Sequence, residues 1–129
     1  MLNIEEIRDY ALSLPFTTAD FPFDEVTMTI RVKGKIFLFL PLDRFPASFS
    51  FKIEPERNVE LQDIHEYIVP AFHLNKQHWA SFDLSISSSQ IYDPAFALSL
   101  IYNSYVLVVS KLKSAEKKEI FELLEKLKK

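Results

Sequence analysis

The sequence predicts an α+β protein of two layers, in which an antiparallel sheet of five strands carries helices on one face. Two observations predict this class. Segments with the two-residue apolar repeat of half-buried strands alternate with segments that have the three- to four-residue repeat of helices. Three predicted strands also follow one another without an intervening helix, which favours antiparallel pairing. The chain has 129 residues, 48% hydrophobic and 26% charged, as in a globular domain. We therefore predict one domain over residues 1–129.

The first helix is predicted by a capping signal. Asn3 and Glu6 have the spacing of a capping box, and Pro15 ends the helix. Residues 16–24 show no clear repeat and are predicted as a loop. The full predicted order of elements is α-β-β-β-α-β-β-α-α.

The three strands that follow differ in their apolar pattern. Residues 25–33 alternate strictly, as in a strand with one buried face. Residues 33–34 include the chain's only glycine, which can supply the positive φ of a tight turn. Residues 35–42 are almost all apolar and predict an interior strand covered on both faces, whereas residues 48–53 alternate again.

The rest of the chain predicts a helix, two strands and two final helices. Pro55 suits the first turn of a helix that runs to about residue 64. A weak strand at 67–74 contains Pro70, which is typical of a sheet edge, and a clear strand spans 77–85. Asp93 and Pro94 suit the N-cap and the first turn of a long helix that runs to about residue 111, and a last helix is predicted over about 114–128.

Composition excludes several kinds of chemistry. The single glycine rules out a P-loop and a dinucleotide-binding loop, since both need several glycines. The lack of cysteine rules out disulfides, thiolate nucleophiles and cysteine zinc sites. No apolar run is long enough to span a bilayer, and no signal-peptide pattern is present. We expect a cytoplasmic protein with no cofactor and no enzymatic activity.

The three histidines are candidates for metal binding or general base catalysis. No carboxylate is placed to complete a coordination set with His65, His73 or His78, so we interpret them as packed or solvated residues. The alternation of residues 77–85 puts His78 on the apolar face, where we expect a core histidine.

A cluster of three carboxylates precedes the first long strand. Asp20, Asp24 and Glu25 cluster there and form either a cation or acid–base site or a solvated loop. We favour the solvated loop.

The strand at 77–85 carries the best candidate for a binding surface. Its alternation separates Ala80, Phe82 and Leu84 from Trp79, the chain's only tryptophan, which falls on the polar face. An indole among hydrogen-bonding groups is typical of small-molecule or base-stacking surfaces. The candidate ligand-binding residues are Asn75, Lys76, Gln77, Trp79, Ser81 and Asp83. An alternative, which we favour, is that the last helix or a second copy of the chain covers this face, because that helix has an apolar stripe to bury.

Charge is distributed unevenly along the chain. Residues 1–110 have 8 Lys and Arg against 14 Asp and Glu, a balance of −6, and residues 111–129 have 7 Lys against 4 Glu, a balance of +3. An acidic body does not favour nucleic-acid binding, which depends on phosphate neutralisation. Only the C-terminal helix offers candidate phosphate contacts, at Lys113, Lys117, Lys118 and Lys126.

Several short segments carry a resemblance when they are taken together and in order. They are Glu5 to Tyr10, Leu14-Pro15, Pro22-Phe23, Gly34 to Phe37, Phe51 to Glu56, His73 to Trp79, and Ser104 to Val109. With these segments the chain resembles the MmcQ/YjbR family of small bacterial proteins, over about residues 1–112. The resemblance implies a CyaY-like or secretion-chaperone-like α+β fold, and it implies DNA binding through a double-wing arrangement. The family has no well-established catalytic residues to carry over.

Our leading hypothesis is therefore a non-enzymatic binding domain that contacts its partner through residues 75–79 and the adjoining strand face. The expected partner is a small molecule or a protein. DNA binding by the lysine-rich helix is the alternative. An enzyme that uses His73 or His78 is a third, less favoured hypothesis. The sequence leaves open whether the protein is a monomer or a homodimer.

Overall fold

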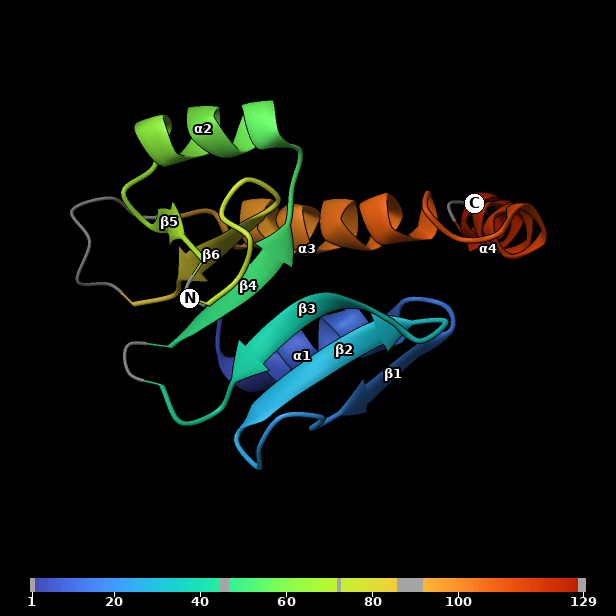
Figure 1. Cartoon of the computed structure of the whole chain (residues 1–129), viewed down its shortest axis with the longest axis horizontal. Helices are drawn as coiled ribbons and strands as arrows, with labels where there is room; N and C mark the ends of the chain where they lie inside the picture. The colour runs from blue at the N-terminus through green and yellow to red at the C-terminus, as the bar shows by residue number, and fades with distance from the viewer. Residues whose placement is uncertain (1, 45–46, 72, 86–91, 128–129) are drawn as a thin grey trace.

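The structure, a computed structural model, describes residues 2–44, 47–71, 73–85 and 92–127. In these ranges the chain forms a six-stranded antiparallel sheet and four helices (Figure 1). The sheet order is β1-β2-β3-β4-β6-β5. The helices are α1 (Ile4–Ser13), α2 (Pro55–Ile64), α3 (Pro94–Val109) and α4 (Ser114–Leu127). The strands are β1 (Thr17–Asp20), β2 (Thr27–Val32), β3 (Lys35–Pro41), β4 (Ser48–Lys52), β5 (Ile68–Pro70) and β6 (Trp79–Asp83).

The predicted five-stranded sheet was wrong by one strand. Residues 17–20, expected to be part of a loop, form β1 and pair with β2 from Thr17 opposite Val32 to Asp20 opposite Thr29. The observed order is α-β-β-β-β-α-β-β-α-α. Four residues are too few to show a repeat, and β1 is an edge strand whose side chains are mostly exposed. Pairing with β2, rather than apolar burial, makes this segment a strand.

Capping and turn chemistry start and end these elements as predicted. The side chain of Asn3 accepts the amide of Glu6 at 2.8 Å, and the carboxylate of Glu6 accepts the amide of Asn3 at 3.2 Å. Asp93 accepts the amide of Ala95 at 2.9 Å and caps α3. Gly34 has φ +83° in the β2–β3 turn, a conformation that favours glycine.

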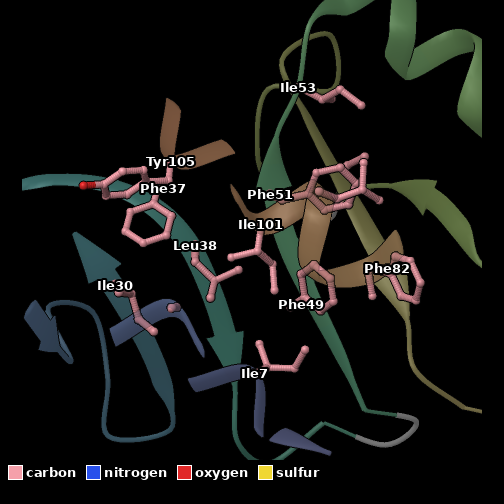
Figure 2. Close-up of a cluster of buried hydrophobic side chains, with 14 of the residues drawn as sticks. Ile7, Ile30, Phe37, Leu38, Phe49, Phe51, Ile53, Phe82, Ile101 and Tyr105 are labelled. Carbon is pink, nitrogen blue, oxygen red and sulfur yellow. The ribbon is translucent and has the colours of Figure 1, made fainter. Parts of the chain in front are cut away.

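Helices α1 and α3 cover one face of the sheet and enclose the hydrophobic core. In Figure 1 both helices lie behind the strands. Figure 2 shows side chains from α1, from β2, β3, β4 and β6, and from α3 meeting in this layer. The rings of Phe49 and Phe82 are stacked there, with centroids 5.2 Å apart. The opposite face of the sheet, which neither helix covers, is called the open face below.

A bulge in β3 explains why its sequence looks apolar throughout. Ile30 pairs with Leu38 and the next residue, Arg31, pairs with Ile36, so Phe37 is an extra residue in β3. Phe37 and Leu38 are therefore both buried in the core. Residues 35–42 were predicted to be covered on both faces; instead, Phe39 is only half-buried, on the open face.

The sheet is split beyond the short β3–β4 ladder, and α3 bridges the split. Only two residue pairs join these strands, Leu38 with Phe51 and Phe39 with Ser50. Past them, the buried hydroxyl of Ser104 donates to the carbonyl of Phe37 at 2.6 Å and accepts the amide of Lys52 at 2.8 Å. A side chain of α3 thus replaces one step of the ladder.

The remaining two helices lie at the margins of the sheet. Helix α2 packs against the edge strand β5, where Pro70 lies as expected. Helix α4 is seen end-on beyond the last turn of α3 in Figure 1, and residue 128, the expected end of this helix, lies outside the described residues. Among the described helices, none combines the length and apolar character needed to cross a bilayer.

Candidate functional site

Trp79 lies on the open face of the sheet, as its place in the alternation predicts. Ala80, Phe82 and Leu84 are buried in the core, whereas Trp79 is half-buried on the other side of β6. Its indole meets the ring of Phe39 edge-on, with centroids 5.2 Å apart and planes at 72°. The parity of β6 is therefore confirmed, and the indole has an aromatic partner that belongs to a different strand.

One exception to that parity is His78. This residue was expected in the core, but it is exposed, because it belongs to the turn that precedes β6. Its amide bonds to the carbonyl of Asn75 and its carbonyl accepts the amide of Ile53 at 2.9 Å. The alternation does not extend into a turn, so the prediction for His78 was wrong.

A single row of side chains crosses the open face from one edge of the sheet to the other. Two polar residues lie on each side of one central aromatic ring, and an apolar residue of β5 ends the row. Phe39 is that ring, and its neighbour in the row, Ser50, leaves space above the sheet because its side chain is small. The hydroxyls of Ser50 and Ser81 are 2.6 Å apart and share a hydrogen bond. In order across the sheet the row is Asp20, Thr29, Phe39, Ser50, Ser81 and Val69.

Two residues of this row, Phe39 and Ser50, belong to the floor of a cleft of about 400 Å³ on the open face. Its size falls in the range of small-molecule sites. One wall is the segment before β2, and the other is the segment after β5. The rings of Phe23 and Phe39 are nearly parallel, 19° apart, with centroids separated by 6.4 Å. The lining residues besides these two rings are Asp24, Thr27, Pro41, Arg44, Ser50, His73 and Leu74.

The predicted acidic cluster is divided between two structural roles. Hydrogen bonds from the Thr29 hydroxyl and from Arg31 lower the pKa of Asp20, which ties β1 to β2. Hydrogen bonds from the amides of Val26 and Thr27, at 2.9 and 2.7 Å, lower the pKa of Asp24. Glu25 is exposed. These carboxylates do not converge, and no group of three or more His, Cys, Asp or Glu in the described ranges could hold a metal ion.

The turn at residues 75–79 is held by hydrogen bonds of its own side chains. The amide oxygen of Asn75 accepts the backbone amides of Gln77 and His78, at 2.9 and 3.3 Å. The ammonium of Lys76 donates to the carbonyl of Ala71 at 3.0 Å. Two of the predicted ligand-binding residues, Asn75 and Lys76, thus bond within the turn, while Gln77 is exposed.

The side chain of Asn58, on α2, fixes this turn through hydrogen bonds. The sequence analysis did not identify this role of Asn58. Its buried side-chain amide nitrogen lies 3.0 to 3.3 Å from the backbone carbonyls of Lys76, Gln77 and Trp79. Gln62 donates to its oxygen at 2.6 Å. A polar residue in a surface helix gives no sequence signal for this role, because its three acceptors lie about 20 residues further along the chain.

The two remaining candidate residues of β6 are also used within the fold. Ser81 is only 8% exposed and bonds to Ser50. Asp83 accepts the amide of Ser85 at 2.8 Å. Phe23, Phe39 and Ser50, which sequence analysis did not select, provide more of the open cleft than these two residues do.

A second cleft, of about 440 Å³, lies on the other side of Trp79. It runs from the indole, beside the split between β3 and β4, to the last turn of α3. Lys52 and Lys111 line it together with the exposed His78. Trp79 therefore has a cleft on one side, and Phe39, its ring partner, borders the other cleft.

The last helix does not cover the tryptophan. Ile120 and Leu124, in the apolar stripe of α4, are buried. Leu124 and Leu127 also line a depression that residues of α1 and α3 border. Lys33 in the β2–β3 turn forms an ion pair with Glu119 at 3.5 Å. The stripe thus packs on the helical layer, and the expectation that this helix covers Trp79 was wrong. Its alternative form, cover by a second copy of the chain, stays a prediction.

The histidines and lysines proposed for other roles lie apart from one another. His65 follows α2, stacks on Tyr67 and packs at a tilt against Phe96, with ring centroids 4.9 and 5.0 Å away. His73 borders the cleft on the open face, whereas His78 borders the second cleft. Of the four candidate phosphate-binding lysines, Lys113, Lys118 and Lys126 are exposed and Lys117 is half-buried.

These features define an α+β protein with a half-covered antiparallel sheet and an aromatic open face. The family model named YjbR matches residues 12–126, a range that includes most of α4. The chain belongs to the YjbR family. It is similar to the uncharacterized protein YbdF of Escherichia coli O157:H7, with 29% identity over 90% of this chain and 92% of that protein. It is also similar to the uncharacterized protein YjbR of Escherichia coli K12, with 27% identity over 95% of this chain and 100% of that protein.

Two solved structures share the fold. The crystal structure of the Deinococcus radiodurans protein DR2400, which has a DUF419 domain, superposes with a TM-score of 0.83. The two sequences are 31% identical, over 93% of this chain and 88% of that one. A Pseudomonas syringae protein superposes with a TM-score of 0.64 and 24% identity, over 80% of this chain and 96% of its own, and shows the fold alone.

Proposed function

We propose that this protein is a non-enzymatic binding domain that holds a small molecule on the open face of its sheet. The observation that carries the proposal is the pair of aromatic rings, Phe39 and Trp79, beside a cleft whose floor includes Ser50. Concave sites with mostly apolar walls and a few placed polar groups are typical of small-molecule binding.

The rigidity of the surroundings supports this proposal. Asn58 and Asn75 fix the turn before Trp79 through side-chain hydrogen bonds, and Asp24 fixes the segment before β2 in the same way. Because both walls of the cleft are held in advance, a ligand would lose little binding free energy in ordering them.

DNA binding by α4 is the second candidate, and charge supports it less well. The candidate lysines alternate with Glu116, Glu119, Glu122 and Glu125, and Glu119 is paired with Lys33. Such a surface resembles a solvated helix with opposite charges three or four residues apart. Binding through it would weaken steeply with added salt. Failure of DNA to retain the protein at low ionic strength would eliminate this candidate.

Titration of the protein with a panel of metabolites, followed by the emission of its single tryptophan, tests the proposal. A ligand of the open face should change the emission of Trp79 in a saturable manner. Ser50→Val, which fills the floor of the cleft, should weaken its binding at least tenfold.

The matched control is Ser48→Val, in the same strand but outside both clefts, which should leave affinity unchanged. An emission that no compound alters, or a ligand bound equally by both variants, would contradict the proposal.

A further inference from the structure

We infer that the cleft on the open face takes a planar aromatic molecule of one or two rings, stacked between Phe23 and Phe39. This inference rests on the proposed function and names the class of ligand. It depends on three properties of the cleft. These are the relative orientation of the Phe23 and Phe39 rings, the hydrogen bonds that fix the segment carrying Phe23, and the hydroxyl groups at the floor.

The two phenyl rings are placed almost as a stacked ligand requires. They are 19° from parallel, and their centroids are 6.4 Å apart. In a stack of three rings placed one above another, spacings of about 3.5 Å put the outer centroids about 7 Å apart. The centroids of Phe23 and Phe39 therefore have to separate by less than about 1 Å, and rotation of the Phe23 side chain removes any sideways offset between the two rings. A saturated ring, which is thicker and puckered, requires a larger displacement of Phe23.

Phe23 is able to make that movement while its backbone stays in place. Its side chain is 67% exposed, the most exposed of the large apolar residues in the described ranges. The chain just after it is fixed by Asp24, which accepts the amides of Val26 and Thr27. Phe39, in contrast, is half-buried in an interior strand and holds its position against Trp79. One plate is therefore fixed and the other is adjustable.

An exposed phenyl ring also gains from this arrangement. A ligand between the rings buries the inner face of Phe23 and that of Phe39 together, and burial of apolar surface is favourable in water. Aromatic stacking on one side chain contributes about 1–3 kcal/mol in comparable sites, which corresponds to roughly five- to 100-fold in affinity.

The floor of the cleft adds a directional contact. Ser50 and Ser81 carry two O–H donors and share one hydrogen bond at 2.6 Å. When Ser81 donates to Ser50, the O–H of Ser50 is left to donate into the cleft. The ligand should therefore carry an acceptor, such as a ring nitrogen or a carbonyl oxygen, on the edge that reaches Ser50.

Ligand-observed NMR with matched pairs of compounds tests the inference on the full-length protein. The aromatic probes are benzoate, indole and adenine, and the saturated counterpart of benzoate is cyclohexanecarboxylate, which has the same charge. We expect benzoate to bind at least tenfold more tightly than cyclohexanecarboxylate. Adenine should bind more tightly than indole, since indole offers no ring acceptor to Ser50.

Three substitutions locate the binding. Phe23→Leu and Phe39→Leu should each weaken binding of the aromatic probes about tenfold. The control Phe21→Leu changes another exposed ring of the same segment, which does not line the cleft, and should have no effect. Preserved circular dichroism of each variant establishes that it is folded.

The outcomes separate this inference from the proposed function. Equal binding of aromatic and saturated probes, with loss on Ser50→Val but not on Phe23→Leu, would overturn the stacking and leave the open face as the site. Tighter binding to Phe23→Leu would overturn it too, because Phe23 would then block the cleft. Binding that no cleft substitution affects, with unaltered Trp79 emission, would overturn both.

Discussion

The ring of Phe39 meets the indole of Trp79 edge-on across β4, a strand that separates their own two strands in the sheet. The contact spans the sheet because the intervening residue on this face, Ser50, has a small side chain. Edge-to-face pairs of this kind contribute about 0.5–1.5 kcal/mol beyond the area they bury. The pair thus stabilises the open face and places an aromatic surface between two clefts.

Asn58 should be a determinant of both stability and the geometry of the tryptophan turn. Asn58→Ala leaves the carbonyls of Lys76, Gln77 and Trp79 without this donor, and we expect a loss of about 2–3 kcal/mol of unfolding free energy. Urea denaturation followed by circular dichroism measures the loss. The emission of Trp79 should also shift to longer wavelength, because the indole becomes more exposed.

Asn103→Ala is the control for this substitution. Asn103 is also a helical asparagine, but its side chain donates to an exposed carboxylate, that of Glu54, at 3.1 Å. A change within about 0.5 kcal/mol is expected. Equal effects of the two substitutions would show that the contacts of Asn58 with the turn are unimportant.

Ser104 should hold the two halves of the sheet together. Ser104→Ala removes the hydroxyl that bridges Phe37 and Lys52, and two buried backbone groups lose a partner. The expected cost is about 2 kcal/mol in unfolding free energy. Hydrogen exchange of the Lys52 amide should become faster.

Ser99→Ala, in the same helix, is the matched control. The hydroxyl of Ser99 is exposed and bonds within its own helix, to the carbonyl of Phe96. Its loss should change stability by no more than about 0.5 kcal/mol. If Ser104→Ala is equally neutral, the β3–β4 ladder does not need the bridge.

Acid should loosen the segment that carries Phe23. The pKa of Asp24 lies below its ordinary value of 3.8, chiefly because its ionised carboxylate accepts the amides of Val26 and Thr27. A lowered pKa in the folded state means that this contribution to stability is complete above pH 3.8. The contribution is lost as the pH falls through the folded pKa.

An NMR titration checks this prediction. The carboxyl carbon of Asp24 and the amides of Val26 and Thr27 should titrate together, with a midpoint below 3.8. Asp24→Asn should remove the transition from both amides, whereas Asp43→Asn, in an exposed connecting segment, should preserve it. A midpoint at or above 3.8 would contradict the assigned hydrogen bonds.

Local patterns predicted much of this fold. Alternation in residues 77–85 put Trp79 and Phe82 on different faces of the sheet. Capping signals at Asn3 and Asp93 marked the starts of two helices. These features depend on neighbours within a few residues, which a sequence displays directly.

Features that depend on distant residues could not be predicted. The β3 bulge at Phe37 made a one-sided strand look buried on both faces, so Phe39 was not recognised as part of the site. The direction of α4 follows from its packing on the helical layer. Because α4 lies there, it leaves the indole of Trp79 uncovered. Asn58 acts on carbonyls about 20 residues away, which no local pattern reveals.

Solvent access to Trp79 tests the central claim most directly. Acrylamide quenching of the native full-length protein measures it, with the urea-unfolded protein as the reference for full exposure. We predict intermediate quenching of Trp79, identical at low and high protein concentration, because α4 packs elsewhere and the proposed binding surface has to stay open to its ligand. A blue-shifted emission that acrylamide cannot reach, or one that becomes accessible only on dilution, would contradict the account.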